Sequence, residues 1–298
     1  MAVTHTEVYR PFEGELQRAT FPWWPIAATG ISLAWKKKLP ILLLYLPVGI
    51  ATIVHCFMVY SAFALGNDVQ GSTPQQMLLV AVAKQLLNVR WIISDFNFVV
   101  GHFSVLVMAW FGAGLICEDR RVNAHLLYFT RPIRRIDYLL GKLAAVGFWG
   151  ICTSLLSGLV ICLVAVFTSP DWAFLTEQYS TIFLTIAYSF TWILTVSSIC
   201  LATSSVLPRK SFALIGIIAY FLLSGSAGEI LVHVTDHEYW GLISPSACFD
   251  AIRRWIFASE GGRAEWSEVW PYFTAVAGYC TVSWAILYVR IRRLEVVA

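Results

Sequence analysis

The chain has 298 residues, of which 58% are hydrophobic and only 13% are charged, and its mean hydropathy is +0.69. Soluble domains carry about 25% charged residues, so this composition excludes a soluble globular protein and indicates an integral membrane protein. The formal net charge of +3 is small and gives no reason to expect a nucleic-acid partner.

Residues 1–20 are polar and lack the apolar core of a cleavable signal, so we expect the first span to stay in the protein. Residues 21–38 combine tryptophans, which prefer the membrane interface, with a run of lysines. They predict an amphipathic helix along the cytoplasmic leaflet, with a simple flanking anchor as the alternative. Ile26, Ile31 and Leu33 roughly share a face, which favours the helix. The predicted anchoring residues are Trp23, Trp24, Trp35 and Lys36.

Six apolar stretches follow, each close to the roughly 20 residues that a helix needs to cross a bilayer. A backbone in hydrocarbon must satisfy its own hydrogen bonds, and these stretches lack the short alternating strands of a membrane barrel. The sequence therefore predicts an all-α membrane protein with six transmembrane helices and a single transmembrane domain, residues 1–298. The predicted spans are residues 40–63, 98–116, 143–167, 182–207, 212–234 and 269–289.

The distribution of basic residues predicts the orientation of these spans. If the N terminus is cytoplasmic, most of the 21 Lys and Arg residues fall on the cytoplasmic side, as the positive-inside rule requires. Both termini are therefore assigned to the cytoplasm. The basic residues left on the outer side are Lys84, Arg90, Arg253, Arg254 and Arg263.

Two longer segments are predicted on the outer side. Residues 64–97 contain an apolar part that predicts either an amphipathic helix on the outer surface or a marginal extra span. Lys84 and Arg90 oppose the extra span, because a charge near the bilayer centre costs about 2.5–3.5 kcal/mol. Residues 235–268 contain a second predicted short helix just before the last span.

The densest block of charge lies at residues 117–142, between the second and third spans. Such a block cannot enter lipid, and its basic character places it in the cytoplasm. It contains a short apolar ridge, His125-Leu126-Leu127-Tyr128-Phe129, and Pro132 then ends any helix. A short helix that is partly apolar and partly basic suits docking onto a soluble partner. The basic residues of the block are Arg120, Arg121, Arg131, Arg134, Arg135 and Lys142.

This block resembles the signature of ATP-binding cassette (ABC) type-2 permeases. The resemblance lies in Glu118, in Arg131-Pro132-Ile133-Arg134-Arg135 and in Tyr138-Leu139-Leu140-Gly141-Lys142. Asn123-Ala124 stands where a Gly-Thr-like pair is expected, and Arg134 stands where Ser is common, so the branch of the family stays open. The hydropathy layout extends the resemblance over nearly all of the chain.

The resemblance implies a permease subunit, working as an exporter, in which residues 117–142 form a coupling helix that presses on a separate cytosolic ATPase. It also implies a cytoplasmic tail and an N-terminal elbow helix within residues 1–38, with the helix at residues 21–38, and a re-entrant or outer helix before the sixth span. The ATPase would bind ATP and Mg, and the chain would form a homodimer or pair with a related permease in the lipid of the cell (inner) membrane. The expected coupling residues are Glu118, Arg120, Arg121, His125, Leu127, Tyr128, Arg131, Pro132, Arg135 and Lys142.

The search for catalytic motifs is negative. Gly141-Lys142 lacks both the upstream glycine and the hydroxyl residue of a P-loop, so we do not expect this chain to hydrolyse ATP or to hold a cofactor. Metalloprotease, nucleophile-elbow and zinc-spacing motifs are missing from the sequence as well. The predicted spans carry few central carboxylates, which counts against an ion-coupled carrier.

Several polar residues in the spans leave alternatives open. His233 and His237, spaced i and i+4 beyond Glu229, are weak metal candidates, and such residues more often form the hydrated end of a span. His55 and His102 are expected to be hydrogen-bonded bundle residues. The fourth span is rich in Ser and Thr, which allow close helix contact, so we expect it in the interior.

A second function is compatible with the same sequence. A non-transporting membrane anchor or scaffold subunit of a larger assembly would use the same basic block for docking. Apolar spans with Ser and Thr suit lipids, hydrophobic drugs, peptides or a maturation factor equally, so the sequence does not identify a substrate.

Overall fold

The computed structural model describes residues 21–67, 88–124, 134–258 and 264–294. These residues form helices and short connections and no strand, and six of the helical stretches are long and apolar enough to cross a membrane. The prediction of an all-α protein with six spans is confirmed. The six stretches are Lys38–Ala64, Val89–Arg121, Arg135–Thr168, Tyr179–Val206, Lys210–Thr235 and Trp266–Arg292.

The described part of the chain consists of successive helices joined by short connections. The first part of the chain forms α1 (Trp24–Trp35), α2 (Lys38–Asn67), α4 (Val89–Gly112), α5 (Cys117–Arg121), α7 (Arg135–Gly150), the π-helical turn η1 (Ile151–Leu155) and α8 (Leu156–Thr168). The second part forms η2 (Pro170–Trp172), α9 (Ala173–Glu177), α10 (Tyr179–Val206), α11 (Lys210–Thr235), η3 (Glu238–Ile243), α12 (Pro245–Phe257) and α13 (Trp266–Leu294).

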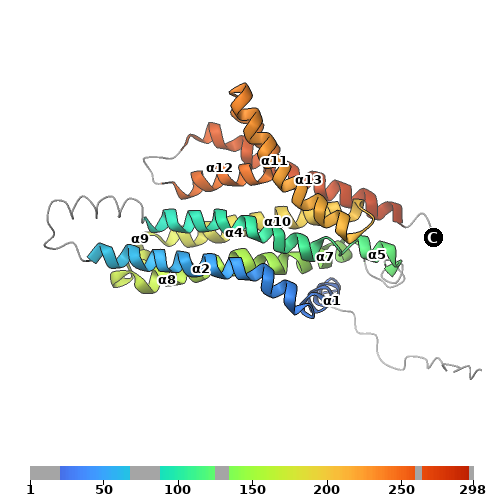
Figure 1. Cartoon of the computed structure of the whole chain (residues 1–298), viewed down its shortest axis with the longest axis horizontal. Helices are drawn as coiled ribbons and strands as arrows, with labels where there is room; N and C mark the ends of the chain where they lie inside the picture. The colour runs from blue at the N-terminus through green and yellow to red at the C-terminus, as the bar shows by residue number, and fades with distance from the viewer. Residues whose placement is uncertain (1–20, 68–87, 125–133, 259–263, 295–298) are drawn as a thin grey trace, which may run out of the picture.

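Helices α2, α4, α7, α8 and α10 run alongside one another between two ends of the molecule, and α11 crosses them at an angle and projects from the bundle (Figure 1). One end carries α1, α5 and the C-terminal end of α13, and we call it the α5 end. The opposite end carries α9, and we call it the α9 end. Helix α1 and the C-terminal end of α13 thus lie at the same end of the molecule.

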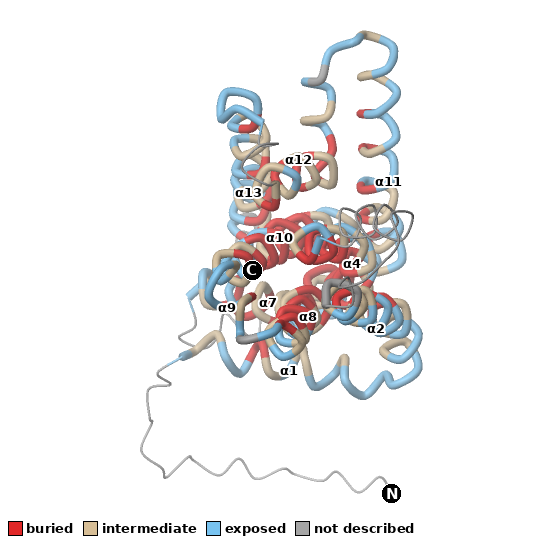
Figure 2. The backbone as a smooth tube through the Cα atoms, turned by 90° about the vertical axis from the view of Figure 1, so that its left-hand side faces the viewer, coloured by how far each residue is buried: buried red, intermediate tan, exposed pale blue. Residues whose placement is uncertain are grey.

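Helix α10 forms the centre of the bundle and packs against α4, α7, α11, α12 and α13 (Figure 2). Its hydroxyl side chains face this interior, which confirms the prediction for the fourth span. Small residues permit the close contact that such packing needs. The buried hydroxyl residues of α10 are Thr181, Thr185, Ser189, Thr195, Ser197, Ser198, Ser204 and Ser205.

The outer faces of the bundle are apolar. Helices α2 and α11 expose large hydrophobic side chains, as expected for surfaces that contact lipid or another membrane chain. The exposed residues include Leu42, Leu43, Leu46, Ile53 and Phe57 on α2 and Ile215, Leu222, Leu223 and Ile230 on α11.

The second span begins earlier than the sequence predicted. Helix α4 starts at Val89 rather than at residue 98, so the prediction of an outer-surface helix is wrong for residues 89–97, while residues 68–87 lie outside the described residues. Arg90, one of the two charges that argued against an extra span, is hydrogen-bonded to a neighbouring helix. Arg90 donates hydrogen bonds to Ser180 and Thr181, both at 3.3 Å.

Asp95, on the same early part of α4, pairs with His55 of α2. The Nε2 of His55 lies 3.2 Å from Oδ2 of Asp95, and its Nδ1 lies 2.8 Å from the carbonyl oxygen of Ala51. His55 is therefore a hydrogen-bonded bundle residue, as predicted. His102 has an exposed side chain, its Nδ1 lies 2.8 Å from the Phe98 carbonyl oxygen of its own helix, and its ring lies edge-on to the Phe98 ring.

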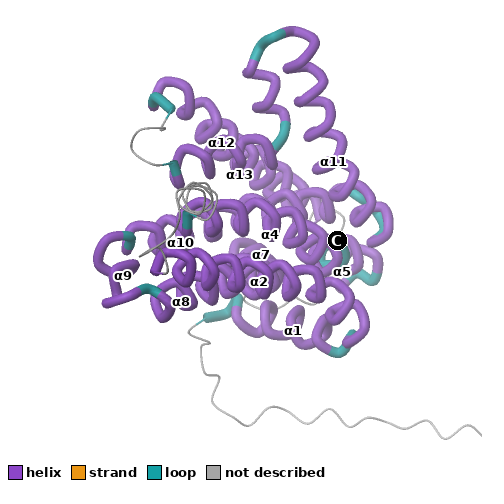
Figure 3. The backbone as a smooth tube through the Cα atoms, turned by 60° about the vertical axis from the view of Figure 1, so that its left-hand side comes forward, coloured by secondary structure: helices purple, strands orange, loops and turns teal. Residues whose placement is uncertain are grey.

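The short helix predicted before the last span is α12, and it enters the bundle rather than lying on the outer surface. The hydroxyl of Ser244 caps its start by accepting a hydrogen bond from the Ala247 N–H at 3.3 Å. The ring of Phe249 then packs 4.8 Å from Trp192, which lies at the middle of α10. Figure 3 shows the chain returning from the end of α11 through η3 into α12. Helix α12 thus packs against α4, α10, α11 and α13.

The predicted N-terminal helix is present as α1. It packs along α7, with Ile26 and Ala27 buried, whereas Leu33 is 58% exposed and does not share their packed surface. Trp35 stacks on Trp149 of α7 with ring centroids 5.6 Å apart. These contacts fix α1 at the α5 end of the bundle.

Candidate functional site

The candidate site is the connection between the second and third spans, residues 117–142. The structure describes half of the coupling residues expected from the sequence, namely Glu118, Arg120, Arg121, Arg135 and Lys142. The other expected coupling residues, His125, Leu127, Tyr128, Arg131 and Pro132, lie outside the described residues. The structure therefore describes the two flanks of the connection, residues 117–124 and 134–142.

The first flank begins where α4 breaks, at residues 113–116. The hydroxyl of Ser204, near the end of α10, donates a hydrogen bond to the Ala113 carbonyl at 2.7 Å. The same oxygen accepts from the N–H groups of Ile116 and Cys117, both at 3.2 Å. One buried hydroxyl thus uses its donor and both acceptor positions to join α10 to the start of α5.

A second contact joins the same two helices. The guanidinium of Arg120 donates a hydrogen bond to the carbonyl of Ser205, the residue next to Ser204. The end of α10 is therefore held to α5 by a side chain from each helix. Glu118 and Arg121 are exposed at this flank, so their charges are available to a partner.

The start of α11 also reaches this flank. Gly114 lies so close to Lys210 and Glu118 that an added Cβ would sit 3.2 Å and 3.3 Å from their side-chain carbons. The ammonium of Lys210 lies 5.2 Å from the ring centroid of Trp110, within the range of a cation–π contact. The break after α4 is consequently packed against both α10 and α11.

An ion pair links the two flanks to each other. The Nζ of Lys142, on α7, lies 2.7 Å from Oδ2 of Asp119, on α5, and the side chains are 7% and 17% exposed. The Tyr138 hydroxyl donates a hydrogen bond to the same carboxylate oxygen at 2.8 Å. Asp119, Tyr138 and Lys142, which we call the clamp, hold the beginning and the end of the connection together. The clamp therefore ties the two described flanks of the connection to each other.

Sequence reasoning identified Lys142 but missed the other clamp residues and Ser204. The i, i+4 spacing of Tyr138 and Lys142 is a signal that they share one face of a helix. Asp119 could not be chosen over the adjacent Glu118 from the sequence. Ser204 is one of many hydroxyls in its span, and 88 residues separate it from Ile116.

Helix α1 lies directly beside the clamp. A Cβ added at Gly141 would meet Ile26 Cβ and the Trp23 carbonyl oxygen, both at 2.8 Å. Trp23 is thus partly buried against α7, whereas Trp24 and Trp35 are 56% and 57% exposed. Lys36, just after α1, is exposed as well. Of the four predicted elbow residues, Trp23 is the one held closest to the coupling connection.

Gly141→Ala is expected to destabilise the protein, because the added methyl group meets backbone and Cβ atoms that cannot move without shifting α1. Overpacking of this kind costs about 1–3 kcal/mol. The matched control is Gly49→Ala in α2, where an added Cβ has nothing within 4 Å. Thermal unfolding in detergent should show a lower melting temperature for Gly141→Ala alone, and equal melting of the two variants would contradict the tight contact.

The weak metal candidates do not form a pair. Helix α11 ends at Thr235, and Asp236 adopts a left-handed conformation with φ 58°. His237 therefore lies beyond the helix, and the spacing that related it to His233 no longer applies. Among the described residues there is no group of three or more side chains suited to hold a metal ion. His233 instead lines a cavity together with Glu229.

Comparison with known proteins agrees with this architecture. The sequence profile of the ABC-2 family transporter proteins matches residues 50–296, which is most of the chain and includes both flanks of the candidate site. No curated protein matches the chain. The six apolar helices agree with a multi-pass membrane component of such a transporter. The chain therefore belongs to the ABC-2 family of transporter proteins.

Proposed function

We propose that this chain is the permease subunit of an ATP-driven exporter and that residues 117–142 form its coupling segment. The observation that carries the proposal is the clamp, in which Asp119 and Lys142 tie the two flanks of this segment to each other. Ser204 and Arg120 extend the tie to the central helix α10. A force applied to the segment would therefore act on α5, α7 and α10 together.

The mechanism follows from these contacts. A separate cytosolic ATPase, which binds ATP and Mg, would press on the connection when its subunits close. Coupling requires contacts that differ between two states of the permease, and a clamped connection can pass such a movement to the spans as a unit. The spans would then alternate between inward-facing and outward-facing arrangements.

The proposed assembly is a pair of permease chains in the cell (inner) membrane with two ATPase subunits. The exposed apolar faces of α2 and α11 support contact with lipid and with a second permease chain. The dense basic residues at the α5 end support a cytoplasmic location for that end and for both termini.

Cysteine labelling tests this orientation. In a background without the native cysteines, Asn123→Cys is expected to react with a membrane-impermeant maleimide only after the cells are permeabilised. Glu177→Cys, exposed on α9 at the opposite end, is the matched control and should react in intact cells. Labelling of Asn123→Cys in intact cells would overturn the coupling role of the connection.

The alternative function, a non-transporting anchor or scaffold, uses the same docking residues but requires no movement. The two functions differ in the effect of the permease on the ATPase. Reconstitution in liposomes with the copurifying ATPase should show that this chain changes the rate of ATP hydrolysis. Binding of the ATPase with no change in its rate would favour the anchor.

A further inference from the structure

A cavity of about 560 Å³ lies between α4, α11, α12 and α13. One side of α11 contributes Gly225, Gly228, Glu229, Val232 and His233, which recur at helical spacing. Gly228 allows η3 to approach α11, because a Cβ there would already lie 3.3 Å from the Trp240 carbonyl oxygen. The cavity is thus bordered by η3, α12 and the last part of α11.

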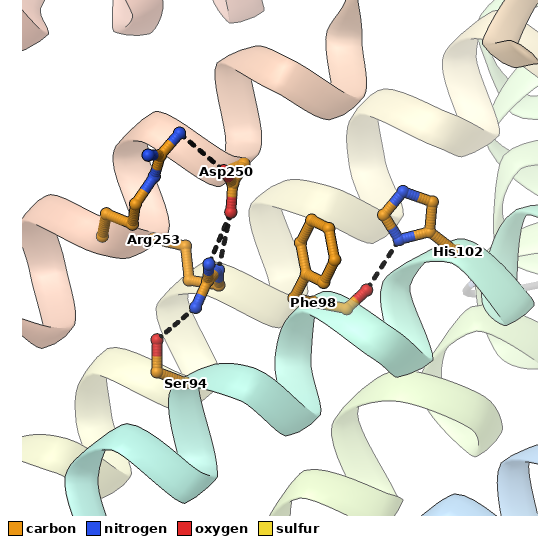
Figure 4. A network of polar contacts seen from close by, with 6 residues as sticks. Ser94, Phe98, His102, Asp250 and Arg253 are labelled. Atoms are coloured by element: carbon orange, nitrogen blue, oxygen red, sulfur yellow. Dashed lines mark hydrogen bonds and ion pairs between the residues drawn. The ribbon is translucent and has the colours of Figure 1, made fainter. Parts of the chain in front are cut away.

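Some of the charges at the cavity are already paired (Figure 4). Asp250 of α12 lies 2.5 Å from Nη2 of Arg253 and 2.7 Å from Nη2 of Arg254. Arg253 also donates a hydrogen bond to the Ser94 hydroxyl at 2.6 Å, and its guanidinium lies 5.1 Å from the Phe98 ring centroid. This network fastens α12 to α4, and its single carboxylate is shared by two guanidinium groups, of which that of Arg254 lines the cavity.

Two other charges at the cavity have no such partner. The carboxylates of Glu229, on α11, and Glu268, on α13, line the cavity, and no described residue forms an ion pair with either. Glu229 lies within a membrane span, where an isolated charge is costly and usually faces a cavity or a partner, and Glu268 lies in the first turn of α13. The lining contains the carboxylates of Glu229, Asp250 and Glu268 against the one guanidinium of Arg254, so the charge presented to an occupant is negative.

Part of the wall suits an apolar body. Phe98, Val232, Val269 and Tyr272 come from three different helices and contribute hydrophobic and aromatic surface to the same cavity. Aromatic faces also attract cations. Glu229 precedes the end of α11 at Thr235 by about 9 Å along the helix axis. The cavity near Glu229 can therefore hold a molecule that has a positively charged group beside an apolar part.

We propose that this cavity binds a cationic amphiphile, with its positive group at Glu229 and Glu268 and its apolar part against Phe98 and Tyr272. This inference rests on the proposed export function and names the chemical class of its substrate. A metal ion is a poorer occupant, because no group of three or more ligating side chains occurs in the described part of the chain. An anion would meet two unpaired carboxylates.

Binding is measured without the ATPase, so failure of this inference and failure of the coupling proposal are distinguishable. The full chain is placed in phosphatidylcholine nanodiscs and titrated with tetraphenylphosphonium, a lipophilic cation, with empty nanodiscs subtracted. Tetraphenylborate, which has the same shape and the opposite charge, is the matched probe. Saturable binding of the cation and not of the anion is expected.

The variants locate the site. Glu229→Gln and Glu268→Gln should each weaken binding of the cation roughly tenfold, since each removes one charge-assisted contact. Glu265→Gln is the matched control, because Glu265 is exposed directly before α13 but does not line the cavity. Val232→Trp, which fills the cavity without changing its charge, should also abolish binding while the melting temperature shows a folded protein. Equal binding of both probes, no saturable binding of the cation, or unchanged affinity in the Glu229→Gln/Glu268→Gln variant would overturn the proposal.

Discussion

Leu127→Asp combined with Tyr128→Ala is expected to abolish copurification of the ATPase with this chain. Both residues belong to the apolar ridge 125–129, which lies outside the described residues and between the two flanks held by the clamp. Loss of two central apolar contacts costs about 2 kcal/mol each or more, and a charge buried at the interface adds to this. Affinity should therefore fall by about a thousandfold or more.

The measurement is affinity purification of the tagged permease in mild detergent, followed by quantification of the ATPase and by a transport assay. Leu175→Asp combined with Tyr179→Ala is the matched control, because these exposed residues lie near α9 at the opposite end of the molecule. The control should retain the complex. Full retention of both the complex and transport by the ridge variant would remove the coupling assignment.

Lys142→Met is expected to destabilise the bundle and to uncouple the ATPase from transport. The substitution removes the only charge paired with Asp119 among the described residues and leaves that carboxylate, 17% exposed, without its counter-ion. Breaking one partner of a buried ion pair costs about 3–5 kcal/mol. Lys38→Met, an exposed lysine at the start of α2, is the matched control and should unfold like the wild type.

The double variant Asp119→Asn with Lys142→Met separates stability from coupling. Asparagine can still accept the hydrogen bond from Tyr138, and no charge is left unpaired, so most of the lost stability should return. The ion pair between α5 and α7 remains absent, so stimulation of ATP hydrolysis should stay low. A Lys142→Met variant that melts and transports like the wild type would show that the clamp has no mechanical role.

The membrane spans show how far local sequence information reaches. Their number and approximate positions were predicted from apolar length alone, because partition of a helix into lipid depends on its own composition. The start of the second span was misplaced because Lys84 and Arg90 argued against insertion. The guanidinium of Arg90 finds hydrogen-bond partners in Ser180 and Thr181, which lie far from it in sequence.

The candidate site, too, was predicted only in part from the sequence. The motif around Glu118 and Lys142 was enough to indicate the family, and the match over residues 50–296 confirms it. The roles of Asp119 and Ser204 could not be predicted, since each depends on a contact between helices. The cavity at Glu229 could not be predicted either, because it forms only where α12 packs near α4, α11 and α13.

By itself, the amino-acid sequence determined that this protein is a helical membrane permease with a basic, charged connection between its second and third spans. Hydrophobicity and charge act locally along the chain, so they can be evaluated without knowing the fold. Only the tertiary structure decided which charges are neutralised, as in the clamp, and which remain unpaired, as at Glu229 and Glu268. Electrostatic interactions depend on distance in space, and that distance is set by how the helices pack.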